Sequence, residues 1–235
     1  MTDLHTHILP GMDDGPQELA AALALLEQQA RQGIRRIALT SHYDCTSEPL
    51  AQFLNRREAS FAALRAAAPA GLDLKRGCEV WYSPELLHIE ASKLCLEGTP
   101  YLLLELPFRT WGKEELRQVS NFNCARGITP ILAHYERYRS LQSRQMYVQM
   151  ARQDVLVQKN AESFSGFFRE RRACREVKSG MIHLLGSDCH NLGSRKPNMN
   201  LAAESLQRRG LQKELDRITK NSWEIFSLAN KESRG

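Results

Sequence analysis

Short apolar segments of strand length alternate with helix-forming segments over most of this chain, and their order limits the fold to a few architectures. Residues 102–104 are three consecutive leucines, which suits a strand buried on both faces. Strands that alternate with helices pair in parallel, with the helices packed outside the sheet. The seven expected strands cover residues 3–5, 36–42, 72–79, 101–107, 129–134, 155–158 and 181–188.

The segments between these strands favour helices. Residues 18–33 are rich in alanine and leucine and end at Gly33, a residue that commonly terminates helices. Further helices are expected at 50–68, 85–95, 113–126 and 138–152, with closing helices over 197–232. We therefore expect an α/β barrel of about seven βα units, with a doubly wound open sheet as the alternative.

The composition indicates one domain over residues 1–235. Hydrophobic residues make up 42% of the chain and can supply a sizeable core, while no linker, repeat or low-complexity tract divides it. No run approaches the roughly 18 apolar residues of a membrane helix, and the first residues lack the basic and apolar regions of a signal peptide. A cytoplasmic protein that is not itself a membrane protein is expected.

Cysteine content and charge exclude several kinds of site. The six cysteines include no C-x-x-C pair, so neither a zinc ribbon nor a thioredoxin-like site is expected, and reduced thiols fit best. The net charge of +5 is mild, and the densest basic group, residues 169–175, has the pattern of a solvated helix face. No nucleic-acid partner is expected, whereas an acidic or phosphorylated partner is compatible with this charge.

Histidines and carboxylates lie at the C-terminal ends of the expected strands. Five of the seven histidines do so. In parallel α/β folds these strand ends converge on one mouth, where active sites are built. The side chains expected to share this pocket are His5, His7, His42, Glu79, Glu105, His134, Asp188 and His190.

Such a cluster indicates bound cations. One histidine or glutamate alone would be unremarkable, but carboxylates packed this closely repel unless cations neutralise them. Residues His5 and His7 point to the same side of a strand because they are two positions apart, and Glu105 is a costly carboxylate within an apolar strand. Histidine with carboxylate and no cysteine suits Mn, Fe or Zn, and the number of ligands suits two or three ions.

Six motifs carry a family resemblance. They are D-L-H-T-H-I-L-P-G-M-D-D-G at 3–15, T-S-H at 40–42, G-C-E at 77–79, L-E-L-P at 104–107, A-H-Y-E-R-Y at 133–138 and S-D-C-H-N-L-G-S-R at 187–195. Together they resemble the polymerase and histidinol phosphatase (PHP) superfamily. Within it, the chain is most similar to the bacterial manganese-dependent protein-tyrosine phosphatases of the CpsB/YwqE type, which serve capsule and exopolysaccharide systems.

The resemblance implies a distorted (β/α)7 barrel, as in the PHP fold, that holds three ions. Mn²⁺ is the expected metal, with Fe, Zn, Co and Mg as alternatives. Asp14 is favoured as a ligand over its neighbour Asp13. A simple turn would also explain the sequence D-D-G at residues 13–15. The implied ligand sets are His5, His7, Glu79 and Asp188; Glu79, Glu105 and His134, with Glu79 bridging; and Asp14, His42 and His190.

Two arginines match family positions that contact the substrate phosphate. They are Arg137 and Arg195, and a guanidinium suits phosphate through its two parallel N–H donors. Without the resemblance, each would be taken for a surface arginine. The resemblance therefore implies a catalytic role for both.

Residues 189–195 also match C-x5-R, the core of the cysteine-dependent tyrosine phosphatases. Asp188 precedes the cysteine and should raise its pKa, whereas a nucleophilic thiol needs a lowered pKa. Lys196 and Pro197 replace the small hydroxyl residue expected after the arginine. We therefore expect the match to be accidental.

The expected activity is hydrolysis of phosphotyrosine by a metal-dependent phosphoric monoester hydrolase. The implied partner is a phosphotyrosine-containing protein, the tail of a membrane-associated bacterial tyrosine kinase of polysaccharide assembly. Histidinol phosphate or another small phosphomonoester is the alternative substrate, and a non-catalytic binding module is the alternative of another class. Family members can be oligomeric, so a homo-oligomer stays open.

Overall fold

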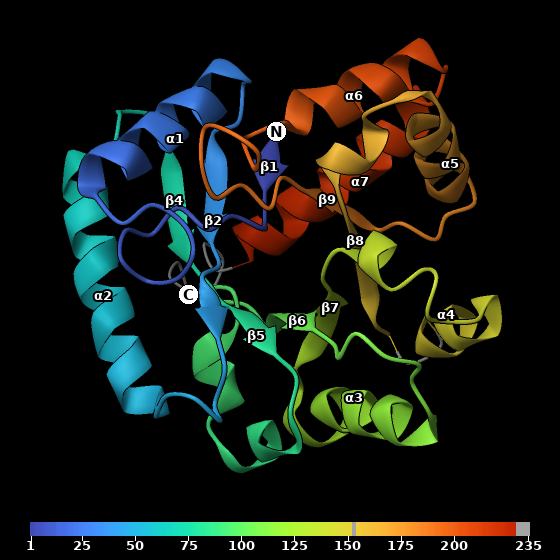
Figure 1. The fold of residues 1–235 in the computed structure, drawn as a ribbon, viewed down its shortest axis with the longest axis horizontal. Helices are drawn as coiled ribbons and strands as arrows, with labels where there is room; N and C mark the ends of the chain where they lie inside the picture. Colours follow the sequence, from blue (N-terminus) through green and yellow to red (C-terminus); the bar gives the residue numbers. More distant parts are fainter. Residues whose placement is uncertain (152–153, 229–235) are drawn as a thin grey trace.

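A computed structural model describes residues 1–151 and 154–228. Its strands are all parallel and curl around a common centre, with helices outside them, so the fold is a mixed α/β fold with a curled parallel sheet (Figure 1). One sheet has the order β1-β2-β4, formed by Thr2–Asp3, Arg36–Leu39 and Asp73–Arg76. The other has the order β3-β5-β6-β7-β8-β9, formed by His42–Tyr43, Glu79–Trp81, Tyr101–Glu105, Thr129–Leu132, Leu156–Asn160 and Leu184–Gly186.

Two of the expected strands are each divided in two. The segment expected at 36–42 forms β2 and β3, and the segment expected at 72–79 forms β4 and β5. The two breaks lie side by side in the sheet. There the Glu79 amide donates to the carbonyl oxygens of both Thr40 and Ser41, at 3.0 and 3.1 Å, whereas a regular ladder has one acceptor for each amide. The described residues therefore form nine short strands where seven were expected.

The segment after β1 connects the first and last parts of the sheet. Thr6 forms an isolated parallel bridge with Cys189, and the His7 amide donates to the Cys189 carbonyl oxygen at 2.9 Å. On its other side, the Thr40 amide donates to the Thr6 carbonyl oxygen at 2.8 Å. Residues close to β9 and β2 thus flank the same N-terminal segment.

The helices follow the expected segments with three differences. Residues 85–95 form two short 3-10 helices, Pro84–His88 and Ala91–Leu94, because the chain is extended at Ile89 between them. The helix expected at 138–152 begins only at Arg144, and Arg152 lies outside the described residues, as do residues 229–232 of the closing helices. The α-helices are α1 Leu19–Arg31, α2 Leu50–Ala67, α3 Lys113–Arg126, α4 Arg144–Ala151, α5 Phe167–Lys178, α6 Met199–Arg208 and α7 Gln212–Ser227. Helix α5 has no counterpart among the expected helices, although the basic residues 169–175 have the pattern of a solvated helix face.

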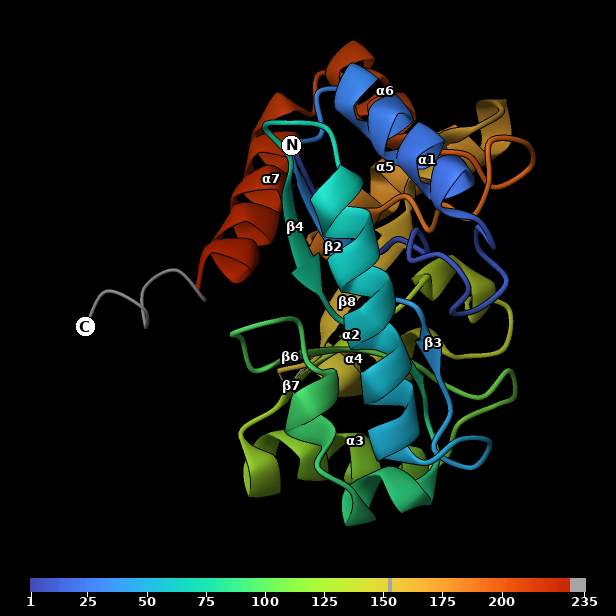
Figure 2. The same cartoon turned by 90° about the vertical axis from the view of Figure 1, so that its left-hand side faces the viewer.

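The sheet is apolar on both sides, as the three consecutive leucines predicted. Leu102 and Leu104 join the large core beneath the outer helices. Leu103 points the other way and packs with Leu4, Ala38, Ile131 and Leu184 from four other strand segments. Helix α7 adds Ile225 and Phe226 to this inner cluster, and Figure 2 shows α7 beside β4 and the N-terminus. Burial of a leucine, isoleucine or phenylalanine side chain contributes about 1.5–3 kcal/mol to the free energy of unfolding. The inner cluster therefore stabilises the sheet from the side opposite to the outer helices.

No helix within residues 1–151 and 154–228 has both the length and the apolar composition that crossing a bilayer requires.

Candidate metal centre

The strand ends bring the expected ionisable side chains together. Glu105 is the last residue of β6, and His134 and Asp188 follow β7 and β9 by two residues. The expectation that His42 and Glu79 end their strands is wrong: each begins a short strand, β3 or β5, because the expected strand is broken just before it. All of these except His42 are buried. Apart from His134, the ligand atoms of the expected residues and of Asp14 form three overlapping groups, and within each group all of these atoms lie within 4.8 Å of one another.

The first group is built around the two histidines after β1. Their Nε2 atoms lie 3.2 Å apart, as expected for residues that share one side of an extended segment. Glu79 Oε2 is 3.1 Å from His5 Nε2 and 3.0 Å from His7 Nε2, and Asp188 Oδ1 is 3.4 Å from both. Two nitrogen and two oxygen atoms therefore converge on one point.

The second group contains the other oxygen of Glu79. His134 Nε2 lies 2.7 Å from Glu79 Oε1 and 3.1 Å from Glu105 Oε1. His42, Glu79 and Glu105 also form a group within the 4.8 Å limit. Glu79 thus takes part in two groups with different oxygen atoms, which is the geometry of a carboxylate shared by two sites.

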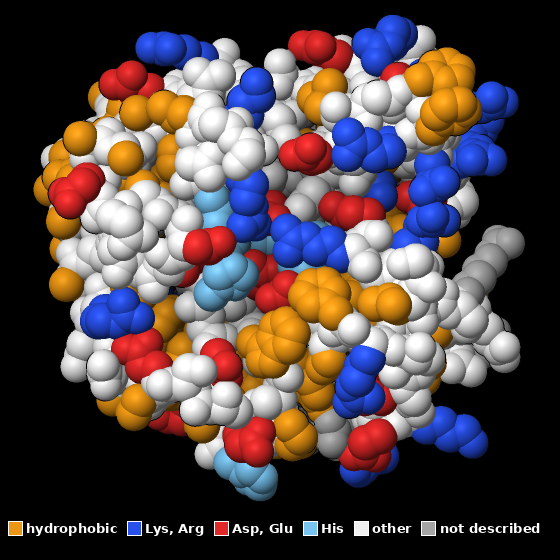
Figure 3. Space-filling view, in the orientation of Figure 1, with side chains coloured by type: hydrophobic (Ala, Val, Ile, Leu, Met, Phe, Trp, Pro, Cys, Tyr) orange, Lys and Arg blue, Asp and Glu red, His pale blue; other side chains and the backbone are white. Residues whose placement is uncertain are grey.

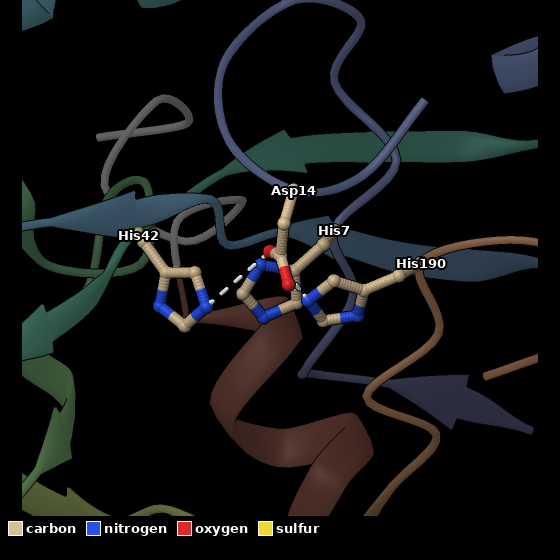
Figure 4. Close-up of side chains that lie close together, drawn as sticks. All are labelled: His7, Asp14, His42 and His190. Atoms are coloured by element: carbon tan, nitrogen blue, oxygen red, sulfur yellow. Dashed lines mark ion pairs between the residues drawn. The ribbon is translucent and has the colours of Figure 1, made fainter. Parts of the chain in front are cut away.

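The third group contains Asp14, as Figure 4 shows. Its Oδ1 atom lies 3.0 Å from His190 Nε2 and 3.7 Å from His42 Nε2, and the His7 ring stacks on His190 with centroids 3.9 Å apart. Asp13 turns elsewhere: its Oδ2 accepts from His7 Nδ1 at 2.7 Å and from the His42 amide at 2.9 Å. Asp14 therefore faces the third group, whereas Asp13 fixes the orientation of the His7 ring.

The backbone at two of these strand ends is strained. His134 and Asp188 have φ angles of 30° and 52°, in the left-handed region that side-chain-bearing residues seldom adopt. Gly186 lies two residues before Asp188, and a Cβ there would come within 2.5 Å of Gln158 Nε2 and 2.8 Å of His5 Cβ. The glycine is thus required for the close packing that supports the His5 ring.

The pKa is raised for some of these histidines and lowered for another. Burial disfavours the charged form of His7, but hydrogen bonds with Asp13 and Glu79 outweigh it and raise the His7 pKa to about 10. His134 behaves similarly, with a pKa raised to about 9 against burial by the Glu79 charge and by hydrogen bonds with Glu105 and Glu79. For His190, burial and the neighbouring His7 charge lower the pKa to about 4. Carboxylates here hold protons on some rings, and divalent ions could replace those protons.

The donor set fits divalent metal ions. His190 Nε2 is buried and makes no hydrogen bond to any described residue, although Asp14 Oδ1 is 3.0 Å away. Imidazole nitrogen and carboxylate oxygen, without a thiolate in any of the three groups, are ligands suited to Mn, Fe and Zn. The Nε2 atoms of His5 and His7 also face each other, 3.2 Å apart. Imidazole nitrogens that face one another in this way indicate a place for a cation.

Both predicted arginines lie at this centre. Arg137 Nη2 donates to Asp188 Oδ2 at 2.6 Å, and Arg195 Nη2 donates to Asp188 Oδ1 at 2.8 Å. Arg195 Nη1 also donates to Asp14 Oδ2 at 3.1 Å. The two guanidinium groups are only partly buried and lie beside the ligands, where they can turn toward an anion.

Sequence reasoning missed residues that position the ligands from behind. Gln158 Oε1 accepts from the His134 amide at 2.6 Å, and Gln158 Nε2 donates to Asn160 Oδ1 at 2.9 Å. Asn160 Nδ2 in turn donates to Asp188 Oδ2 at 2.8 Å. The spacing of the two amides could have indicated this role, because residues at alternate positions near the end of a strand share one face.

The remaining motif, C-x5-R, does not form a nucleophilic site. Cys189 is completely buried, and its Sγ lies 3.6 Å from the Gln29 side-chain amide nitrogen. Burial, with the nearby Asp3 charge, raises the pKa of the Cys189 thiol far above its usual range. A buried thiol with a raised pKa cannot act as a thiolate nucleophile, so the structure agrees with the expectation that this match is accidental. All five cysteines with described side chains are free thiols.

A cavity opens beside the ligand groups. It has a volume of about 510 Å³, and Arg137, Arg195 and Asp188 contribute to its lining. In Figure 3 the hollow in the middle of the face exposes histidine and acidic side chains, with basic side chains along its margin.

Comparison with known protein families gives a match over nearly the whole chain: the model for "Capsular polysaccharide synthesis, CpsB/CapC" matches residues 1–227.

The chain belongs to the CpsB/CapC family. Two relatives bear this out. The tyrosine-protein phosphatase CpsB of Streptococcus pneumoniae is 30% identical over 226 residues, covering 89% of this chain and 90% of that protein. The tyrosine-protein phosphatase YwqE of Bacillus subtilis is 28% identical over 204 residues, covering 83% and 79%.

The fold of this CpsB/CapC family member has also been seen in crystals. A structure from a study of YwqE from Bacillus subtilis and CpsB from Streptococcus pneumoniae, described there as unique metal-dependent tyrosine phosphatases, superposes with a TM-score of 0.84. It is 24% identical, and the match covers 97% of this chain and 95% of that one. This superposition shows that the fold is that of a known structure, whereas the family model and the relatives confirm the expected family.

Proposed function

We propose that this protein is a metal-dependent protein-tyrosine phosphatase. The observation that carries the proposal is the convergence of three overlapping His/carboxylate groups beside a cavity that Asp188, Arg137 and Arg195 help to line. Membership of the CpsB/CapC family and the names of the relatives support phosphotyrosine as the substrate. A binding module that uses metals only for structure would not need two arginines beside the ligand groups at the mouth of an open cavity.

The proposed ligands are the residues of the three groups together with His134. His5, His7, Glu79 and Asp188 would hold one ion; Glu79, Glu105 and His134 a second; and Asp14, His42 and His190 a third. Mn²⁺ is the proposed metal. When bound, such ions supply Lewis-acid charge to phosphoryl oxygens and activate water as a nucleophile at neutral pH.

The chain's own residues bind and orient the phosphoryl group. Arg137 donates to Asp188, and Arg195 donates to Asp188 and Asp14. A guanidinium has five N–H donors, so each arginine retains donors for the phosphoryl oxygens. Gln158 and Asn160 hold His134 and Asp188 in place while charge builds up on the phosphoryl group. The phenol of tyrosine has a pKa of about 10, so its departure requires little help from a strong acid.

An aromatic side chain at the centre favours an aryl ester. Phe108 is 47% exposed and stacks on His134 and Tyr138, with centroids 6.2 and 5.1 Å apart. The ring of phosphotyrosine could pack on its open face as its phosphate reaches the arginines. Histidinol phosphate, the alternative substrate, would gain less from this surface.

The proposal also covers the type of barrel, the substrate protein and the compartment in which the enzyme acts. The curled sheet, joined through Thr6 to residues near β2 and β9, supports the description as a distorted (β/α)7 barrel in one domain. The proposed substrate protein is the phosphorylated tail of a membrane-associated polysaccharide-assembly kinase, on which the enzyme would act in the cytoplasm. Support comes from the family's description in capsular polysaccharide synthesis.

A direct assay tests the substrate. We expect the Mn²⁺-loaded protein to hydrolyse a phosphotyrosine peptide with a kcat/KM at least about a hundredfold above that for histidinol phosphate, because the phenol is the better leaving group and its ring meets Phe108. Phosphate release from the two substrates under identical conditions measures the ratio. A higher kcat/KM for histidinol phosphate would reject the proposed substrate and favour the small-molecule alternative.

The cysteine motif provides a second prediction. Cys189→Ala should leave kcat for a phosphotyrosine peptide within about threefold of wild type, because the thiol is buried away from the cavity and its pKa is raised. Alkylation of the native protein should likewise leave activity unchanged. Loss of activity in the variant, with an unchanged melting temperature, would show that the thiol acts in catalysis.

A further inference from the structure

The cavity beside the metal centre continues onto a second group of arginines. Besides Arg137 and Arg195 its lining includes Arg139, just after the strand end that carries His134, and Arg169 and Arg172 on α5. We call the part of the cavity lined by Arg139, Arg169 and Arg172 the arginine groove. Figure 3 shows basic side chains collected on the side of the face where Figure 1 places α5.

The charges of the arginine groove are not neutralised by its surroundings. Arg139, Arg169 and Arg172 are exposed, and none of them forms an ion pair with a described residue. The other charged lining groups are engaged: Lys159 Nζ lies 3.0 Å from Glu176, and Glu136 accepts from the Asn160 amide at 3.1 Å. This leaves three arginines with a single carboxylate, Glu162, on the lining.

Helix α5 directs two of these arginines to the same side. Arg169 and Arg172 are three positions apart, so their side chains are neighbours on the helix surface. Ala173, Cys174 and Val177 form the buried face of α5. Two more exposed arginines on the same helix, Arg171 and Arg175, lie on its other flank and do not line the cavity. The basic residues expected at 169–175 thus divide into a groove-lining pair and a solvated pair.

We infer that the arginine groove binds a second anionic group of the substrate peptide, close in sequence to the phosphotyrosine at the metal centre. The inference rests on the proposed function and specifies its substrate class. Arg137 and Arg195 are sufficient for one phosphate, and none of the three further arginines pairs with a carboxylate of the described residues, although Arg169 Nε donates to the Ser165 carbonyl oxygen at 2.9 Å. Guanidinium groups bind carboxylate and phosphate alike, so the anion is either an acidic side chain or a second phosphotyrosine.

The physical basis is charge complementarity between peptide and groove. Exposed ion pairs are individually weak, but two or three acting on one peptide give a total discrimination of about tenfold. The volume of about 510 Å³ lies in the range of roughly 300–1,000 Å³ that is usual for ligand sites. The preference should weaken as salt concentration rises, because these charges are exposed.

Kinetics on matched substrates test the inference. The substrates are p-nitrophenyl phosphate and three phosphotyrosine peptides, one with neutral flanks, one with acidic flanks and one with a second phosphotyrosine. For wild type we expect kcat/KM to be about tenfold higher for at least one anionic peptide than for the neutral one, mostly through KM. Arg169→Glu/Arg172→Glu should remove this preference and leave turnover of p-nitrophenyl phosphate within about twofold, which also shows that the variant folds.

The control is Arg171→Glu/Arg175→Glu, which makes the same change in charge on the same helix outside the groove. It should retain the preference, and an equal loss in both variants would mean that net charge alone is responsible and would overturn the inference. Equal kcat/KM for all three peptides in wild type would overturn it too, while leaving the proposed function intact. If wild type hydrolyses no phosphomonoester at all, the proposed function fails and the inference fails with it. Preference for only one anionic peptide supports the inference and identifies which anion the groove takes.

Discussion

Glu79→Gln should lower kcat for a phosphotyrosine peptide by at least about a thousandfold, the largest effect expected from any single isosteric change in this protein. Glu79 is 1% exposed, and its two oxygens serve different ligand groups, Oε2 facing His5 and His7 and Oε1 facing His134. Glutamine keeps the shape but supplies one neutral oxygen, so both proposed ion sites lose charge. Steady-state kinetics together with elemental analysis of the purified variant measure the effect.

A matched control is Glu90→Gln, the same chemical change at an exposed glutamate that forms an ion pair with Lys93 at the surface, away from the three groups. It should retain wild-type kcat and metal content. The shared-ligand assignment of Glu79 would be contradicted if Glu79→Gln kept its full complement of metal and a kcat within tenfold of wild type.

Removing metal should have the second large effect. We expect a chelator to abolish activity, at least about a hundredfold, and Mn²⁺ to restore it. An ion present at a thousand times its Kd stabilises the folded state by about 4 kcal/mol, which corresponds to a rise in Tm of roughly 8–16 °C for a chain of this size. Activity assays and thermal unfolding with and without chelator measure both quantities.

The same experiment predicts a dependence on pH. Hydrogen bonds with Asp13 and Glu79 raise the pKa of His7 to about 10 against burial, so His7 holds a proton at neutral pH in the absence of metal. Metal binding must release that proton, and metal affinity should therefore increase as pH rises. A Tm that does not respond to chelator, or a metal affinity that decreases as pH rises from 6 to 8, would contradict this account.

The sequence predicted the elements that position the site better than it predicted their boundaries. The run of leucines at 102–104 correctly indicated a sheet buried on both faces, and Glu105 correctly marked the end of β6. The division of the strands at Thr40–Ser41 was missed because it depends on a shared hydrogen bond from the distant Glu79 amide. Long-range contacts of this kind leave no local pattern in the sequence.

The site shows the same distinction. Ligands at strand ends could be predicted because parallel strands deliver their ends to one place. The different roles of Asp13 and Asp14 could not be deduced from composition, since adjacent residues in a turn point in directions set by the loop: one faces His7 Nδ1 and the other faces His190. Gln158 and Asn160 were missed for another reason, because neutral amides carry no charge that draws attention to a site.

Anomalous scattering from crystals grown with Mn²⁺ tests the central claim, that side chains distant in sequence jointly hold divalent ions. We predict peaks within coordination distance of Glu79, with His5 and His7 on one side and Glu105 and His134 on the other, and a further peak between Asp14 and His190. An anomalous map without peaks at these residues, from protein that is active with Mn²⁺, would contradict the account.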